Sequence, residues 1–131
     1  MPRMLTPSPC FLVRDVLASA RWYRDTLGFQ FSTWGEPPDF AIAFRDGLEI
    51  FLRQPKGAYA TMTSRTRTAR AVEPGAIDAF LRVDDVDGLA AELKGRGVTL
   101  TTEPVTRFYK YREIEVTDPD GYILCFAQDL S

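Results

Sequence analysis

The side chains best placed for chemistry in this sequence are carboxylates that interrupt apolar strand patterns. Glu49 breaks residues 48–53, a run otherwise filled by leucine, isoleucine, phenylalanine and a final arginine. Glu113 and Glu115 alternate with apolar residues within residues 112–128. Because successive side chains of a strand point to opposite faces, each carboxylate lies opposite the apolar set, where it could bind a cation, accept a proton or line a cavity. For Glu113 and Glu115, plain solvation on an exposed strand face remains the alternative.

Histidine is absent from the sequence. Histidine is the commonest metal ligand and the commonest general base near neutral pH, so its absence excludes Ser-His-Asp catalysis, Cys-His catalysis and histidine-based metal sites. Lysine occurs only at Lys56, Lys94 and Lys110, and no glycine loop of the kind that cradles phosphate is present. P-loop and Rossmann functions are therefore excluded as well.

The two cysteines, Cys10 and Cys125, do not form a C-x-x-C pair. Neither a disulfide framework nor a zinc site follows from their spacing. We therefore expect both to be small buried hydrophobic residues.

Composition limits the class of protein. With 131 residues, 45% of them hydrophobic and 26% charged, the chain suits one compact domain or two small halves that share a core. The formal net charge of -2 argues against a nucleic-acid partner, because phosphate recognition needs a concentrated excess of lysine and arginine. The apolar runs are too short to cross a membrane, and no hydrophobic secretory core is present, so we expect a cytoplasmic protein.

Residues 112–128 predict a β-hairpin. Asp118-Pro119-Asp120-Gly121 presets a tight reversal between two alternating runs. One face then carries the core residues Ile114, Val116, Tyr122, Leu124 and Phe126, and the other carries Glu113, Glu115, Ile123, Cys125 and Ala127.

The first half of the chain predicts a strand, a helix and three more strands. A strand over residues 9–14 leads into Asp15, which we expect to cap a helix that ends at Gly28. The helical spacing is carried by Val16, Ala20, Tyr23 and Leu27. Strands are predicted at residues 29–34, 40–45 and 48–53, with a hairpin turn at Asp46-Gly47.

The same order returns in the second half. Val83-Asp84-Asp85-Val86 echoes Val13-Arg14-Asp15-Val16, and a helix that Gly97 ends follows with Val86, Leu89, Ala90 and Leu93 at helical spacing. Further strands are predicted at residues 98–102, at residues 107–116 with an irregular start, and at residues 122–127. Residues 54–75 between the halves lack an apolar period, so we expect a linker of a length often found in lids and binding loops.

The combined pattern resembles the vicinal oxygen chelate superfamily, which includes glyoxalase I, bleomycin-resistance proteins and ring-cleaving dioxygenases. The resemblance is carried by V-x-D before a helix, by Trp22-Tyr23 followed by Leu27-Gly28-Phe29, and by D-P-D-G-Y before the last strand. It implies an α+β fold in which two β-α-β-β-β modules, residues 8–53 and 76–128, form half-barrel sheets around a cleft. It also implies a homodimer, because such clefts are often completed across one.

The resemblance places four metal-ligand positions of that family on Ser8, Glu49, Asp78 and Cys125. Metal-dependent relatives often carry histidine or glutamate there, and only Glu49 keeps that pattern. A set of two carboxylates, a serine and a buried cysteine suits no common divalent ion, because thiolate is a soft ligand and carboxylate a hard one. We therefore expect neither a metal nor another cofactor.

A chain of this kind resembles the metal-free, bleomycin-resistance type, which sequesters a drug. The sequence then predicts a small-molecule-binding protein, with a role in antibiotic resistance, whose cleft takes a flat, apolar and cationic ligand on aromatic and acidic side chains. The predicted ligand-binding residues are Phe40, Phe44, Glu49, Phe51, Asp78, Phe80, Tyr111, Glu113 and Cys125. For Phe40, Phe44 and Phe51 an ordinary core position is the alternative. The alternative function is an unusual lyase, isomerase or dioxygenase-like enzyme that uses Glu49 and Asp78 with a weakly bound divalent metal.

Overall fold

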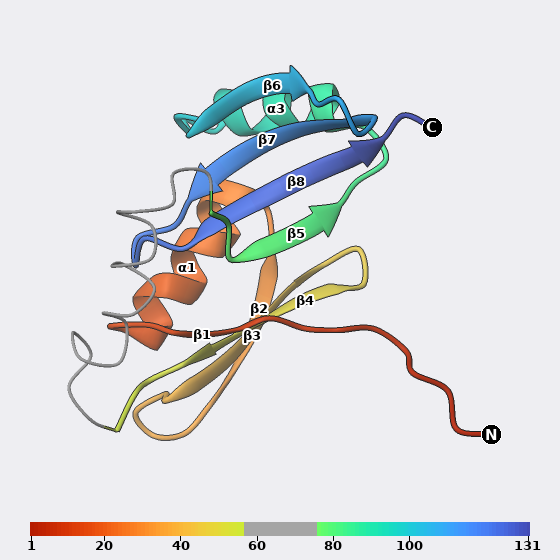
Figure 1. The fold of residues 1–131 in the computed structure, drawn as a ribbon. Coiled ribbons are helices and arrows are strands. Elements are labelled where there is room, and N and C mark those ends of the chain that lie inside the picture. Colours follow the sequence, from red (N-terminus) through yellow and green to blue (C-terminus); the bar gives the residue numbers. More distant parts are fainter. Residues whose placement is uncertain (57–75) are drawn as a thin grey trace.

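The computed structural model describes residues 1–56 and 76–131 as two modules of the same design (Figure 1). The first module consists of β1 (Cys10–Leu12), α1 (Val16–Leu27), β2 (Gln30–Trp34), β3 (Phe40–Arg45) and β4 (Leu48–Arg53). The second consists of β5 (Ala79–Arg82), α3 (Val86–Gly95), β6 (Thr102–Thr106), β7 (Tyr111–Thr117) and β8 (Ile123–Asp129). The predicted α+β fold of two β-α-β-β-β modules is therefore confirmed, while most of the predicted linker lies outside the described residues.

Each module forms a four-stranded sheet in which the first strand lies beside the last. The strand orders are β1-β4-β3-β2 and β5-β8-β7-β6. The pairs β1–β4 and β5–β8 are parallel, and the other neighbours are antiparallel. The β7–β8 hairpin has the predicted faces, since Ile114 pairs with Phe126 and Val116 with Leu124.

The two helices of the described residues, α1 and α3, are each capped by the predicted aspartate. The carboxylate of Asp15 accepts a hydrogen bond of 3.0 Å from the amide of Ala18, and Asp85 accepts one of 2.9 Å from Gly88. These bonds satisfy amides that the first turn of a helix leaves unpaired. The first helix ends at Gly28, whose φ of 73° is the left-handed conformation that glycine adopts without strain.

The second module differs from the sequence prediction at its edge strand. β6 begins at Thr102, whereas the sequence predicted a strand over residues 98–102; the amide of Val98 instead bonds the carbonyl of Leu93 at the end of α3. Pro104 lies within β6, where it is tolerated because an edge strand leaves one row of amides unpaired. β7 begins at Tyr111, and residues 107–110 form the irregular start predicted for the strand over residues 107–116.

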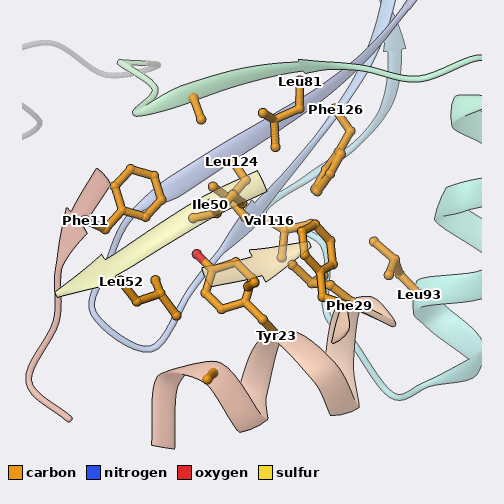
Figure 2. Packing of buried hydrophobic residues seen from close by; sticks show 14 of the residues in the cluster. Phe11, Tyr23, Phe29, Ile50, Leu52, Leu81, Leu93, Val116, Leu124 and Phe126 are labelled. Atoms are coloured by element: carbon orange, nitrogen blue, oxygen red, sulfur yellow. The ribbon is translucent and has the colours of Figure 1, made fainter. Parts of the chain in front are cut away.

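One hydrophobic core serves both modules. Figure 2 shows Ile50 of β4 next to Leu124 of β8, with Tyr23 extending from α1 toward them. Each sheet therefore turns one face toward the shared core and its opposite face away from it. No helix of the described residues is long and apolar enough to cross a membrane.

The D-P-D-G-Y turn of the second module fastens it to the first. The ring of Tyr122 stacks on Phe11 at a centroid distance of 4.2 Å, and its hydroxyl donates a hydrogen bond of 2.7 Å to the carbonyl of Leu12. The carboxylate of Asp120 accepts a hydrogen bond of 2.8 Å from the amide of Arg14. This turn thus fills one end of the junction between the modules.

Candidate functional site

The outward face of the first sheet carries the predicted aromatic residues and Glu49. Because Ala41, Ala43, Ile50 and Leu52 are buried in the core, the alternating residues point away from it. This N-terminal face comprises Phe40, Ile42, Phe44, Glu49 and Phe51.

Three rings form an aromatic cluster on the N-terminal face. Phe40 lies between Trp34 and Phe51, with ring centroids 5.5 and 5.6 Å away, and all three rings keep part of their surface exposed. Glu49 lies directly across from Phe44 in the β3–β4 ladder. The carboxylate of Glu49 is exposed and makes no hydrogen bond or ion pair with another described residue. It is therefore available to a cationic group.

The outward face of the second sheet has the same character. This C-terminal face comprises Phe80, Tyr111, Glu113, Glu115 and Cys125, and the core residues of the same strands point the other way. A row of aromatic rings borders it, with centroid distances of 5.4 Å from Phe80 to Tyr111, 6.0 Å from Tyr111 to Tyr109 and 5.2 Å from Tyr109 to Phe108.

Glu113 is buried beneath two side chains from the β6–β7 connection. It is 3% exposed, and it accepts hydrogen bonds of 3.2 Å from Nε of Arg107 and 2.5 Å from the hydroxyl of Tyr109. The bond to Glu113 raises the pKa of Tyr109 to about 12, so this hydroxyl is a donor at neutral pH. Arg107 balances the charge of the carboxylate, and its own pKa is raised by the same contact. The sequence suggested Tyr109 only as a residue that could cap a cleft, and it gave no role to Arg107, because the contact of both with Glu113 depends on how the turn folds back.

The other two polar groups of the C-terminal face are also buried. Glu115 is 8% exposed and accepts a hydrogen bond of 2.8 Å from Oγ1 of Thr102. Cys125 is 1% exposed, and burial, followed by the nearby charge of Glu113, raises the pKa of its thiol to about 12. Cys125 therefore stays protonated at neutral pH. The alternative that Glu113 and Glu115 are solvated surface residues is wrong.

Asp78 has a structural role before β5. One oxygen of its carboxylate accepts a hydrogen bond of 2.7 Å from the amide of Ile123, and its own amide bonds the carbonyl of Ile123. These bonds join the start of β5 to the start of β8. At least one oxygen of Asp78 is thus already in use.

The structure brings the predicted site residues together in two groups and not in one. Phe40, Phe44, Glu49 and Phe51 lie on the N-terminal face, and Phe80, Tyr111, Glu113 and Cys125 lie on the C-terminal face. Because both sheets turn their other face to one shared core, the two groups point away from each other within a single chain. A cleft bounded by both faces would need two copies of the chain.

The family is decided by comparison with known proteins. The model of the Glyoxalase/Bleomycin resistance protein/Dioxygenase superfamily matches residues 7–126. The chain belongs to this superfamily. A search of curated protein sequences finds no significant match.

Solved structures of the glyoxalase superfamily share the fold along nearly the whole chain. A glyoxalase-related enzyme from Clostridium phytofermentans is 15% identical, with a TM-score of 0.74 and coverage of 98% of this chain and 97% of that one. The bleomycin-binding protein of Streptomyces verticillus, solved with copper(II)-bleomycin, is 23% identical, with a TM-score of 0.68 and coverage of 100% and 99%. A glyoxalase/bleomycin resistance protein/dioxygenase from Alicyclobacillus acidocaldarius is 17% identical, with a TM-score of 0.72 and coverage of 95% and 90%.

The positions that hold a metal in metal-dependent members of the superfamily do not suit an ion in this chain. Cys125 is a buried thiol with a raised pKa, and the carboxylate of Asp78 accepts a hydrogen bond from a backbone amide. Among residues 1–56 and 76–131, no three cysteine, aspartate or glutamate side chains gather at a spacing suited to a metal. The chemistry of these donors, a protonated buried thiol and an already bonded carboxylate beside Glu49, therefore does not fit the superfamily's metal.

Proposed function

We propose that this chain is a small-molecule-binding member of the glyoxalase/bleomycin resistance superfamily that works without a metal and sequesters a cationic aromatic compound, such as an antibiotic. The observation that carries the proposal is the pairing, on each outward face, of an aromatic cluster with carboxylates. Aromatic faces and carboxylates both attract a flat ligand that carries positive charge.

The carboxylates of the two outward faces differ in how far other side chains already occupy them, and this difference indicates which of them would hold the ligand. Glu49 has no partner among the described residues, and Glu115 accepts one side-chain hydrogen bond, from Thr102. Glu113, by contrast, is neutralised by Arg107 and bonded by Tyr109. Glu49 and Glu115 are therefore the residues proposed to hold the cationic group, while Glu113 holds the turn that carries Tyr109.

A binding role is supported by the weakness of the possible catalysts. Cys125 and Tyr109 both have pKa values raised to about 12, so neither supplies a thiolate or a phenolate at neutral pH. A base or nucleophile of either type would need a lower pKa to act near pH 7.

The proposed ligand cleft belongs to a homodimer. Two aromatic faces on one chain that point away from each other would each stay open to water in a monomer. If the N-terminal face of one copy met the C-terminal face of another, two such contacts would form and both clefts would close by the same symmetry. Phe80, 43% exposed, and Trp34, 49% exposed, would then line the walls.

A thermal-shift panel tests the proposal directly. Cationic aromatic compounds and matched anionic ones are compared for the rise in melting temperature, since a ligand at about 100 times its Kd stabilises the folded state by about 2.7 kcal/mol. Cationic compounds should raise the melting temperature of the wild type. The rise should shrink in Glu49→Gln and persist in Glu103→Gln, which removes an exposed carboxylate that pairs with Lys94.

Two results would contradict the proposal. Preference for anionic compounds would show that the carboxylates do not select the ligand. A stoichiometric metal in the purified protein, lost on Glu49→Gln or Asp78→Asn substitution, would instead support the metal-dependent enzyme.

A further inference from the structure

A groove of about 580 Å³ lies at the junction of the two modules, apart from both outward faces. Its volume is within the range of sites for small organic molecules. One wall comes from the end of α1 and the β3–β4 hairpin, and the other from the end of β5 and the first turns of α3. The apolar part of its lining includes Leu27, Phe29, Leu48, Leu89 and Phe126.

The internal repeat of the chain explains why this groove is open. Val13 and Asp15 of the first module correspond to Val83 and Asp85 of the second, and the likeness extends to side-chain contacts. Oε1 of Gln54 accepts a bond from the amide of Val16, and Oε1 of Gln128 accepts the matching bond from Val86. The chain therefore has two equivalent junctions, one at each end of the contact between the modules.

The equivalent junction is filled by the protein itself. There the β7–β8 connection, residues 118–122, inserts Tyr122 against Phe11 and bonds Leu12 and Arg14 through Tyr122 and Asp120. The β3–β4 connection consists of Asp46 and Gly47 alone, and Leu48 takes the place of Tyr122. No bond from Asp46 to the amide of Asp84 matches the bond from Asp120 to Arg14. A shorter turn and a smaller side chain thus leave the groove where an aromatic ring lies in the other half.

The charged part of the lining favours a cation. It comprises the carboxylates of Asp46, Asp84, Asp85 and Glu92 and the guanidinium groups of Arg45 and Arg82. Arg45 and Glu92 pair through two hydrogen bonds of 2.8 Å, which removes one charge of each sign, and Nε of Arg45 also lies 3.6 Å from a carboxylate oxygen of the exposed Asp46. The carboxylate of Asp84 is exposed and has no hydrogen-bond or ion-pair partner among the described residues. The remaining charges leave an excess of negative charge at the rim above an apolar floor.

We propose that this groove is a second ligand site, and that it binds a small aromatic amine. The aryl ring takes the position that Tyr122 occupies in the equivalent junction, beside Leu48 and Leu89, and the ammonium group lies near Asp84 and Asp46. The ligand would bridge the two modules, because each of them supplies one wall. This site does not depend on the cleft proposed for the outward faces.

Titration of ¹⁵N-labelled protein with tyramine, followed by NMR, tests this inference. The expected shifts lie at Leu48, Gly88 and Leu89, and the neutral analogue 4-ethylphenol should bind more weakly. Leu48→Tyr restores the side chain found in the other half, so it should fill the groove and raise the Kd for tyramine by at least about tenfold. The matched control Leu130→Tyr adds the same ring at an exposed position near the C-terminus and should leave the Kd unchanged.

A second variant keeps the test valid should Leu48→Tyr fold poorly. Asp84→Asn changes an exposed carboxylate and should raise the Kd severalfold, while shifts of the free protein change only near residue 84 because the fold is kept. The inference is overturned if tyramine shifts none of the groove residues, if 4-ethylphenol binds equally well, or if a folded Leu48→Tyr protein keeps the wild-type Kd. Shifts confined to Phe51 and Glu115 would place the amine on the outward faces and would likewise overturn the groove site without affecting the proposed function.

Discussion

The hydroxyl of Tyr23 donates a hydrogen bond of 2.9 Å to the carboxylate of Asp118, and this contact joins helix α1 of the first module to the β7–β8 turn of the second. Both residues are buried. The other oxygen of Asp118 accepts bonds of 2.9 Å from the amides of Asp120 and Tyr122, so the same carboxylate shapes the turn and fastens it to the core.

Removing the Tyr23 hydroxyl should destabilise the protein without changing its fold. In Tyr23→Phe, Asp118 loses a donor in a site that water does not reach freely, and the free energy of unfolding should fall by about 1–3 kcal/mol. Chemical denaturation measures the loss. Tyr111→Phe is the control, because the hydroxyl of Tyr111 makes no hydrogen bond with a described residue. Equal stability of the two variants would show that the Tyr23 contact contributes nothing.

Asp118 should also give the protein a specific pH dependence. Burial raises the pKa of its carboxyl from 3.8 to about 6 in the folded state. The folded state therefore holds the proton more tightly than the unfolded state. This contribution to stability is fully present below about pH 4 and is lost as the pH rises through about 6, with a total on the order of 2–3 kcal/mol.

The comparison with Asp118→Asn isolates that contribution. Other carboxylates act in the opposite direction, since the hydrogen bond from Arg45 lowers the pKa of Glu92 and makes its stabilising effect disappear at low pH. The difference in unfolding free energy between wild type and variant should thus shift in favour of the variant from pH 4 to pH 7. Parallel pH profiles for the two proteins would contradict a raised pKa for Asp118.

Sequence patterns predicted the elements whose causes are local. The caps at Asp15 and Asp85, the left-handed Gly28 and the β3–β4 hairpin all depend on residues within a few positions of one another. The alternation of residues 112–128 also predicted correctly which side chains face the core. The spacing of apolar residues and the residues that cap helices can be recognised in a single sequence, because neither depends on contacts between distant residues.

The sequence did not predict features that depend on contacts between residues far apart in the chain or in irregular turns. The start of β6 is set by a bond between Val98 and the end of α3, and the burial of Glu113 by a turn that brings Arg107 and Tyr109 over it. The opposite orientation of the two outward faces follows from sharing one core, which no local pattern specifies. For the same reason the groove at the module junction carries no sequence signal of its own beyond the short Asp46-Gly47 turn.

The Arg45–Glu92 pair should couple the modules energetically. Arg45 also donates a hydrogen bond of 2.8 Å to the carbonyl of Leu27, so one guanidinium connects the end of α1, the β3–β4 hairpin and α3. Both side chains are about a third exposed, so solvent screening limits how much their ion pair adds to the free energy of unfolding. A double-mutant cycle with Arg45→Met and Glu92→Gln should give a coupling energy of about 0.5–1 kcal/mol. Additive losses, with no coupling, would show that the pair does not stabilise the junction.

The two cysteines should differ sharply in reactivity. Cys10 is exposed, so the expectation that both cysteines are buried is wrong for Cys10; Cys125 is buried, and burial raises the pKa of its thiol to about 12. Because the thiolate is the reactive form, a thiol reagent should modify one cysteine rapidly in the native protein and both in denaturant. Cys10→Ser should remove the rapid phase, and Cys125→Ser should leave it unchanged.

The rate at which a thiol reagent modifies Cys10 also tests the proposed homodimer. Cys10 pairs with Phe51 in the β1–β4 ladder, so both side chains belong to the same outward face. If a second copy covers that face, the rate of modification of Cys10 should fall as the protein concentration rises through the dissociation constant of the dimer. Cys125→Ser is the variant to use, because every modification then reports on Cys10 alone. A rate that stays constant from nanomolar to micromolar protein, alongside a dimer detected by sedimentation, would place the dimer contact elsewhere on the molecule.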